Sequence, residues 1–337
     1  MTEAELDSRL SEPAPEDVAA VGTLRGTLAV LGASGKMGPT LARLALRAAE
    51  AAGTELRVVA ISRFREPGVR DDLTARGAEA VTADLTDPTA YDRLPDAEQV
   101  VFMVGHKFGS SADPARTWAT NVLAPAYAAE RYAGARIVAF STGNVYPLTP
   151  VASGGATEAE APAPVGEYAW SALARERVLT HEAQRHGTPL ALLRLNYAVE
   201  PRYGVLRDIA DRVYRGEPID LTMGHVNVIW QRDANAIALR ALAHAGVPPF
   251  LLNVTGSETL AVRFLAEQFG HRFGRVPSFT GHAGPTALLS NAARCQELFG
   301  PPTMRIEARL DAVAEWVLAG GRSLGRPTHY DEREGRF

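Results

Sequence analysis

Between residues 27 and 195, short apolar runs alternate with longer segments that favour helices. The apolar runs cover residues 27–31, 56–61, 80–82, 99–104, 136–140 and 190–195. Uninterrupted apolar runs are typical of strands that are buried on both faces of a parallel sheet. Helices are predicted over residues 38–52, 114–132 and 168–186. This alternation predicts an α/β protein with a Rossmann-type, doubly wound parallel sheet.

The rest of the chain divides into three further segments. Residues 1–26 are rich in Ala, Glu, Asp and Pro and lack a sustained apolar stripe, which predicts a mobile or loosely docked extension. Residues 196–320 are expected to form a smaller substrate lobe, interleaved with the dinucleotide-binding domain of residues 27–195. Residues 321–337 form a polar tail.

Composition limits the class of protein. The 337 residues are 46% hydrophobic, which is enough for a sizeable core. A formal net charge of -4 gives no sign of the basic surface that a nucleic-acid partner requires. No apolar stretch approaches the roughly 18 residues of a membrane span, and no secretory signal is seen. Because Cys295 is the single cysteine, no intrachain disulfide can form, and we expect a cytoplasmic protein.

A glycine-rich turn joins the first apolar run to the first helix. Its residues are Gly32, Ala33, Ser34, Gly35, Lys36, Met37 and Gly38. The spacing G-x-x-G-x-x-G lets the backbone turn tightly and approach a pyrophosphate at the positive end of the following helix. A purely structural turn is the minor alternative, because the motif lies between a strand and a helix of a βαβ unit.

The end of the second apolar run bears on the choice of dinucleotide. An acidic residue there would bind the ribose 2′-hydroxyl of NAD, but the chain has Ser62, Arg63, Phe64 and Arg65. An arginine attracts a 2′-phosphate, and Lys36 could add a second charge. The sequence therefore favours NADP(H), with NAD(H) as the alternative. Arg63 and Arg65 could also be a solvated loop pair.

In collinear order, several segments from Thr27 to Val317 resemble the extended short-chain dehydrogenase/reductase family, also called the NAD-dependent epimerase/dehydratase family. The similar segments are residues 84–87, 101–105, 121–129, 140–146, 157–168, 227–239 and 252–265. The resemblance implies a homodimer and further contacts with the cofactor. Those contacts are assigned to Asp84, Leu85, Val104, Gly105, Lys107 and Asn196.

The resemblance also assigns the reacting groups. Members of the family use a Tyr as proton donor or acceptor, a Ser or Thr that holds the reacting oxygen, and a Lys four residues after the Tyr. The Tyr matches Tyr168 and the Thr matches Thr142, but the Lys position holds Ala172. Without that cation, forming a phenolate at pH 7 costs roughly 4 kcal/mol. Lys107 or an arginine could replace the charge, or Lys107 is only a surface loop charge.

Other positions of the resemblance narrow the substrate. Sugar-nucleotide dehydratases of the family carry Asp-Glu where this chain has Gly143 and Asn144, which disfavours elimination of water. Residues 223–228 lack the arginine that contacts a diphosphate in the epimerases, and residues 196–230 are few. We therefore expect a small sugar-like substrate, such as a free sugar, a lactone or a sugar acid.

Four further residues are expected near that substrate. Asn144, Tyr197 and Trp230 are candidate contacts, although a tryptophan in the core is the more common case. Asn121 matches a helix asparagine that orders a water, or is simply a polar residue on a helix face.

The sequence thus predicts an NAD(P)-dependent oxidoreductase or epimerase. The alternative is a redox-inert NADP(H)-binding sensor or partner subunit, which Ala172 supports and the presence of Tyr168 disfavours. No metal is assigned, because His181 and His186 are five residues apart and do not share a helix face.

Overall fold

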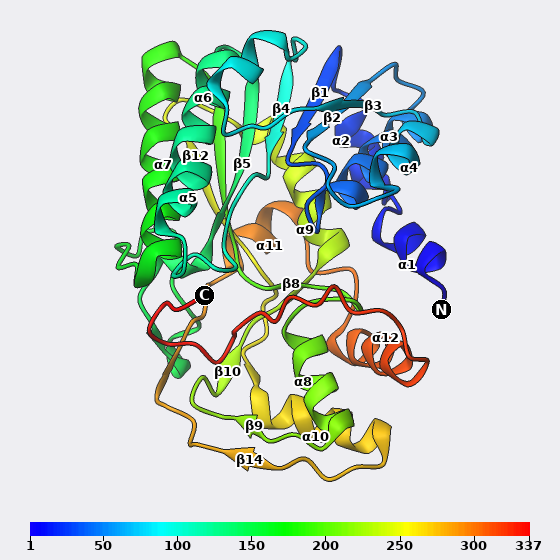
Figure 1. Cartoon of the computed structure of the whole chain (residues 1–337), viewed down its shortest axis with the longest axis vertical. Helices are drawn as coiled ribbons and strands as arrows, with labels where there is room; N and C mark the ends of the chain where they lie inside the picture. Colours follow the sequence, from blue (N-terminus) through cyan, green and yellow to red (C-terminus); the bar gives the residue numbers. More distant parts are fainter.

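The computed structural model describes the whole chain, residues 1–337, around one parallel sheet (Figure 1). The strand order is β12-β7-β5-β4-β1-β2-β3. The seven strands are β1 (Thr27–Leu31), β2 (Arg57–Ser62), β3 (Glu79–Thr82), β4 (Gln99–Phe102), β5 (Arg136–Thr142), β7 (Leu190–Leu195) and β12 (Phe250–Val254). The order reverses between β1 and β4, which opens a crevice at the carboxyl ends of the strands. The predicted doubly wound sheet is confirmed.

Helices cover both faces of the sheet, which explains why its strands are apolar without alternation. Leu28 and Val30 of β1 pack in one core cluster with side chains of the helices on that face, while Ala29 and Leu31 pack in another on the opposite face. The first face is covered by α3 (Gly38–Ala52), α4 (Val69–Ala75) and α9 (Gln231–Arg240). The second is covered by α5 (Pro114–Trp118), α6 (Ala124–Arg131) and α7 (Gly166–His186), with a π-helical turn, Ala119–Leu123, between α5 and α6.

The N-terminal residues are not a loose extension, so that prediction is wrong. They form α1 (Glu3–Leu10) and α2 (Pro15–Val21), and α2 packs on α3 and α9. Leu6 and Leu10 of α1 are fully buried against two tryptophans. Each helix is so short that it buries only a few apolar residues, so no sustained stripe was visible in the sequence.

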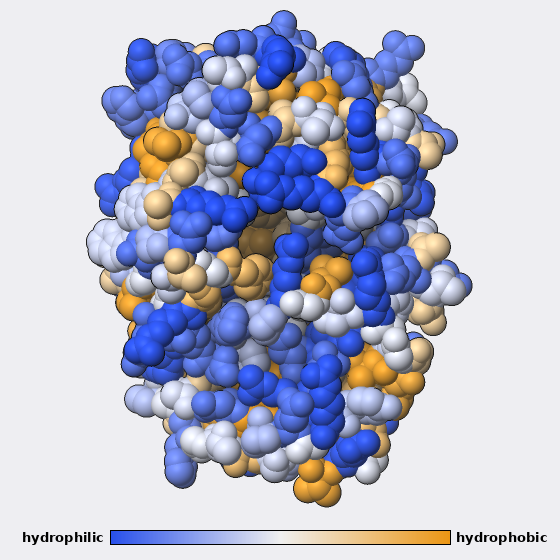
Figure 2. All heavy atoms as spheres, in the orientation of Figure 1, coloured by the Kyte–Doolittle hydropathy of each residue, from blue (hydrophilic) through white to orange (hydrophobic).

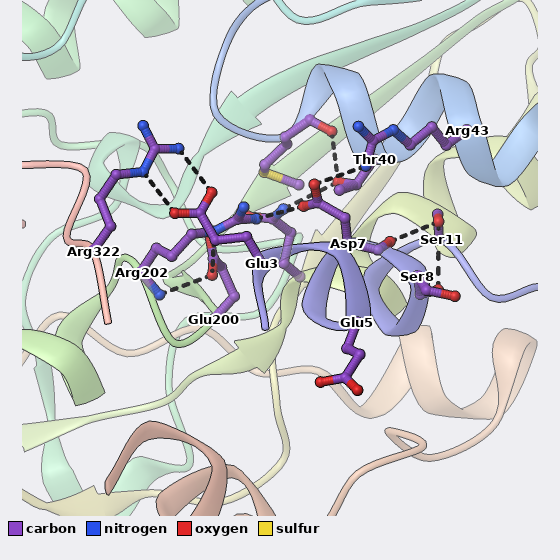
Figure 3. Close-up of polar contacts among 12 residues, drawn as sticks. Glu3, Glu5, Asp7, Ser8, Ser11, Thr40, Arg43, Glu200, Arg202 and Arg322 are labelled. Atoms are coloured by element: carbon purple, nitrogen blue, oxygen red, sulfur yellow. Dashed lines mark hydrogen bonds and ion pairs between the residues drawn. The ribbon is translucent and has the colours of Figure 1, made fainter. Parts of the chain in front are cut away.

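Ion pairs hold α1 between the sheet domain and the lobe (Figure 3). Asp7 pairs with Arg43 of α3 at 2.8 Å and with Arg202, which leads into the lobe, at 2.9 Å. Arg202 also binds Glu200, whose carboxylate is completely buried. Buried charges of this kind are stable only when they are paired, so α1 is an integral part of the fold.

The lobe has its own apolar core, built from α8 (Val205–Arg215), α10 (Val262–Phe273) and α12 (Ile306–Leu318). A further helix, α11 (Ala293–Phe299), packs near β12. Short strands complete the lobe. They are β6 (Thr149–Pro150), β8 (Ala198–Val199), β9 (Ile219–Asp220), β10 (His225–Val226), β11 (Ile229–Trp230), β13 (Leu260–Ala261), β14 (Phe279–Thr280) and β15 (Thr286–Ala287). None of the helices combines the length and the apolar character needed to cross a membrane.

The C-terminal tail, residues 321–337, crosses the front of the molecule and ends beside α7 (Figure 1, red). Tyr330 is buried in the core of the lobe. The backbone N–H of Thr328 donates to Asp208 of α8 at 2.7 Å. Gly335 has φ +75°, and a Cβ there would lie 2.1 Å from the carbonyl oxygen of Val165. The tail is therefore fitted against both the lobe and the start of α7.

Candidate active site and cofactor cleft

A cleft of about 490 Å³ lies at the carboxyl ends of β1, β2, β3 and β4. Figure 2 shows a hollow at this level, rimmed by hydrophilic residues. Of the residues expected to contact the cofactor, the cleft wall contains Gly32, Ser34, Gly35, Arg63, Asp84, Leu85, Val104, Gly105 and Lys107. A larger hollow, about 670 Å³, is lined by His244 and Arg294 among others and shares no residue with this wall.

The glycine turn is packed tightly against its neighbours. Gly32 has φ +91°, and a Cβ on it would lie 3.0 Å from the backbone nitrogen of Val104. A Cβ on Gly38 would lie 2.5 Å from the carbonyl oxygen of Ala33. Gly32 therefore lets the turn pack against the backbone that follows β4 in the wall of the cleft, whereas Gly38 lets α3 pack on the turn and does not line the cleft.

Two other residues of the turn also point away from the cleft, contrary to the expectation from sequence. The Lys36 ammonium donates to the carbonyl oxygen of Ala198 at 2.6 Å and lies 3.8 Å from the ring centroid of Tyr203. It therefore reaches the lobe instead of a 2′-phosphate. Met37 packs against the core.

The cleft carries a surplus of positive charge. Its basic residues are Arg63, Arg65, Lys107, Arg116 and Arg326, against only two carboxylates, Glu66 and Asp84. The chain as a whole has a net charge of -4. Positive charge concentrated in a cleft of an acidic protein attracts an anionic ligand, such as a dinucleotide.

The two groups assigned to catalysis lie next to the cleft. Thr142 is the last residue of β5 and Tyr168 lies in the first turn of α7. The Thr142 hydroxyl donates to the side-chain oxygen of Asn144 at 2.9 Å. Burial raises the pKa of Tyr168, whereas the positive charge of Arg175 and the Thr142 hydroxyl act in the opposite direction. The tyrosine ring meets the ring of Phe337 edge-on, with 5.7 Å between centroids.

Arg175 is a buried cation that the sequence analysis missed. It donates to the carbonyl oxygen of Phe140 at 2.9 Å and to the side-chain oxygen of Asn121 at 2.8 Å, and it forms no ion pair. A Cβ on Gly105 would lie 3.2 Å from its guanidinium, so the charge stands directly behind the cleft wall. Helical spacing could have indicated Arg175 in advance. It follows Tyr168 by seven residues, which is about two helical turns, so the two side chains share one face of the helix.

Lys107 lies between the cleft and the tyrosine. Its ammonium donates to the carbonyl oxygen of Thr328 in the tail, at 3.2 Å. It lies 4.3 Å from the ring centroid of Phe337 and 5.7 Å from that of Tyr168. Burial lowers its pKa to about 8. The alternative that Lys107 is a surface loop charge is therefore wrong.

Residues 28–254, more than half of the chain, match the model of the NAD dependent epimerase/dehydratase family. The chain belongs to this family. A comparison with curated protein sequences finds no match.

Solved structures of similar fold include three sugar-nucleotide epimerases. One is the UDP-glucose 4-epimerase of Thermotoga maritima with UDP-glucose, with a TM-score of 0.72 and 18% identity over 87% of this chain and 99% of that one. Another is the UDP-glucuronic acid 4-epimerase of Bacillus cereus with UDP-glucuronic acid and NAD, at 0.73 and 18% over 87% and 99%. The third, the UDP-glucose 4-epimerase of Thermus thermophilus with NAD, has 0.69 and 20% over 86% and 98%.

In this member of the epimerase/dehydratase family, the position four residues after Tyr168 lies in an apolar cluster. Ala172 is 1% exposed and packs with Val145, Tyr146, Ala156 and Leu173. A lysine ammonium there would have to leave this apolar cluster.

Asn121 is buried, and its amide is fully used by the protein. It donates to the carbonyl oxygen of His106 at 3.0 Å and to Ser171 at 2.9 Å, and it accepts from the backbone N–H of His106 at 2.8 Å. It therefore ties the loop after β4 to α7. Its role in this structure is to position these segments.

Two expected site residues lie elsewhere. Trp230 packs with Leu6, Leu10 and Trp316 under α1 and is 3% exposed, so it cannot stack on a sugar. Asn196 is 2% exposed, donates to Asn227 at 2.7 Å and does not line the cleft. By contrast, Tyr197 is half-buried and lies 6.0 Å from the Lys107 ammonium.

Several residues of the site carried no local signal in the sequence. Arg116 and Arg326 line the cleft, and Phe337 contacts Tyr168. Arg326 and Phe337 belong to a tail whose path is set by contacts with the lobe, which no short motif encodes.

Proposed function

We propose that the chain is an NAD(P)-dependent oxidoreductase or epimerase acting on a hydroxyl or keto carbon of a small sugar-like substrate. The observation that carries this proposal is the position of Tyr168 and Thr142 beside a cationic cleft with a glycine turn. A nicotinamide dinucleotide in that cleft would supply or accept the hydride. Tyr168 would give or take the proton of the reacting oxygen, and Thr142 would hold that oxygen.

Arg175 supports the tyrosine in place of the lysine that Ala172 replaces. Its buried charge has no carboxylate partner and acts to lower the pKa of Tyr168. A fixed cation stabilises a phenolate more than a phenol, so it assists the step in which the tyrosine accepts a proton. Because burial still raises the pKa overall, the site is better suited to carbonyl reduction, which needs a protonated tyrosine.

For the dinucleotide, we take NAD as the first expectation. The neighbours named with a dinucleotide are NAD complexes. Arg63, the residue on which the preference for NADP rested, lies 3.6 Å from the carboxylate of Asp84, which would repel a 2′-phosphate. The preference for NADP that the sequence suggested is thus not supported.

For the substrate, the tail supports a molecule without a nucleotide. Phe337 lies against Tyr168, and the carbonyl oxygen of Phe337 accepts a hydrogen bond from the Ser110 hydroxyl at 3.3 Å. Phe337 thus occupies part of the space beside Tyr168 that a bulky substrate would need. This chain covers 99% of the two epimerase structures, so its lobe is not shortened relative to theirs. The length of the lobe therefore no longer supports a small substrate. Homodimerisation and a cytoplasmic location remain predictions.

The test is a fluorescence titration of the purified chain with NADH and NADPH, followed by a screen of sugar-like carbonyl compounds. We expect NADH to bind and at least one carbonyl compound to be reduced. If neither dinucleotide binds, the proposal is wrong. If a dinucleotide binds and the Tyr168→Phe variant equals wild type in every assay, the chain is a redox-inert sensor, the candidate that Ala172 favours.

A further inference from the structure

Lys107 is a charged group whose partners do not neutralise it. An ammonium has three donors, and the structure gives this one a single hydrogen bond, to the carbonyl oxygen of Thr328. No carboxylate lies within ion-pair distance of it. Its other neighbours are the rings of Phe337, Tyr168, Phe108 and Tyr197, at 4.3, 5.7, 5.9 and 6.0 Å from the ammonium.

The surrounding charges leave a positive excess. Asp208 is the nearby carboxylate that favours the charged form of Lys107, but one of its oxygens already accepts two hydrogen bonds from Thr328. Lys36 lies on the lobe side, where burial lowers its pKa to about 7, and Arg326 adds a guanidinium on the cleft wall. Burying an ammonium without an anion is costly, so an anion that enters this space gains the interaction.

The position of Lys107 defines which ligand it can meet. It lines the cleft for the dinucleotide and also faces the ring of Tyr168. A substrate must touch both the cofactor and the tyrosine in order to react, so it must pass within reach of this ammonium. Because Arg175 acts on the tyrosine, Lys107 is free for a different task.

We propose that Lys107 binds a carboxylate of the substrate, which makes the substrate a small sugar acid. This inference rests on the proposed function and deepens it. The tail sets the geometry: the carbonyl oxygen of Thr328 accepts a hydrogen bond from the ammonium, and the ring of Phe337 packs edge-on against Tyr168. A carboxylate supplies two acceptor oxygens for the two unused donors of the ammonium. Lys107 is thus a residue that determines specificity.

The experiment measures the binding of acids and their neutral counterparts to the full chain saturated with NADH. The pairs are galacturonate and galactose, glucuronate and glucose, and gluconate and glucitol, with UDP-glucose as a separate arm. The variants are Lys107→Met, which keeps the length and removes the charge, and Lys107→Arg, which keeps the charge. Arg177→Met, on the exposed face of α7, is the control for the loss of one positive charge.

We expect at least one acid to bind about tenfold or more tightly than its neutral partner, since each tenfold corresponds to about 1.4 kcal/mol. Lys107→Met should abolish the difference, Lys107→Arg should keep it, and Arg177→Met should match wild type. Because Lys36 and Lys107 are the only lysines, protein labelled at the lysine ε-carbon gives two side-chain NMR signals. The acid should shift the signal that is absent in Lys107→Met.

Three results overturn the inference while leaving the proposed function intact. They are equal binding of acid and neutral partner, failure of every acid to bind, and an acid preference that survives in Lys107→Met. UDP-glucose binding tighter than every free acid overturns the inference and also the small substrate of the proposed function. Loss of NADH binding in Lys107→Met also overturns the inference, since the ammonium would then serve the cofactor. Failure of NADH and NADPH to bind to wild type instead refutes the proposed function.

Discussion

The tyrosine proposed as proton carrier should remain protonated throughout the neutral range. A tyrosine with the ordinary pKa of about 10 is ionised in about one molecule per thousand at pH 7, which costs roughly 4 kcal/mol. Burial of Tyr168 raises its pKa above that value, and no lysine follows one turn later. Alcohol oxidation should therefore accelerate about tenfold per pH unit from pH 7 to 9, whereas carbonyl reduction should hardly change.

The pKa can be measured without a substrate. Protein labelled at the tyrosine ζ-carbon is titrated from pH 6 to 11, and the signal of Tyr168 is the one that Tyr168→Phe removes. We expect no titration of this signal below pH 10. A midpoint below about 9 would refute the reasoning, because it would mean that Arg175 or another cation outweighs burial. Arg175→Met, which removes the charge, separates Arg175 from other cations, and Arg175→Lys, which keeps the charge, is its control.

Three other changes test the site and the fold. Tyr168→Phe should lower turnover by about 100-fold or more and leave the Kd for NADH unchanged, because Tyr168 does not line the cleft. Arg194→Met should lower the free energy of unfolding by about 3–5 kcal/mol, measured by urea denaturation, because it strands the buried carboxylate of Glu176. Gly38→Ala should destabilise the fold by about 1–3 kcal/mol and weaken NADH binding, because the new Cβ meets the backbone of Ala33.

Matched controls make these outcomes decisive. Arg57→Met breaks an ion pair with Glu79 in which both side chains are about half exposed, so it should cost less than about 1 kcal/mol. Gly53→Ala, at the other end of α3, meets nothing within 4 Å, but Gly53 has φ +63°. This variant should therefore cost about 1 kcal/mol of stability through backbone strain and leave NADH binding unchanged. Equal losses of stability in Arg57→Met and Arg194→Met, or equal effects of Gly53→Ala and Gly38→Ala on NADH binding, would contradict the argument from burial.

Local pattern was enough to predict the central fold. Strand β7 and helix α3 have the predicted bounds, and β1 also begins and ends as expected. Their residues are apolar on both faces or follow a helical period, and these periods belong to the backbone itself. The helix predicted over residues 114–132 is interrupted by a π-helical turn. This turn was not predicted, because one extra residue in a single turn leaves no periodic pattern in the sequence.

What the sequence by itself determined is the sheet, the glycine turn and the pair Thr142 and Tyr168, because each depends on neighbours in the chain or on a fixed motif. Only the tertiary structure decided which cations lie near Tyr168 and which residue of the tail packs against it. Arg175 reaches the site through the packing of α7 on β5, and Phe337 through a tail anchored on the lobe. Trp230 lies in the core and not at a substrate site, because α1, which is distant in sequence, covers it. Such placements arise from contacts between distant segments, and no local pattern records them.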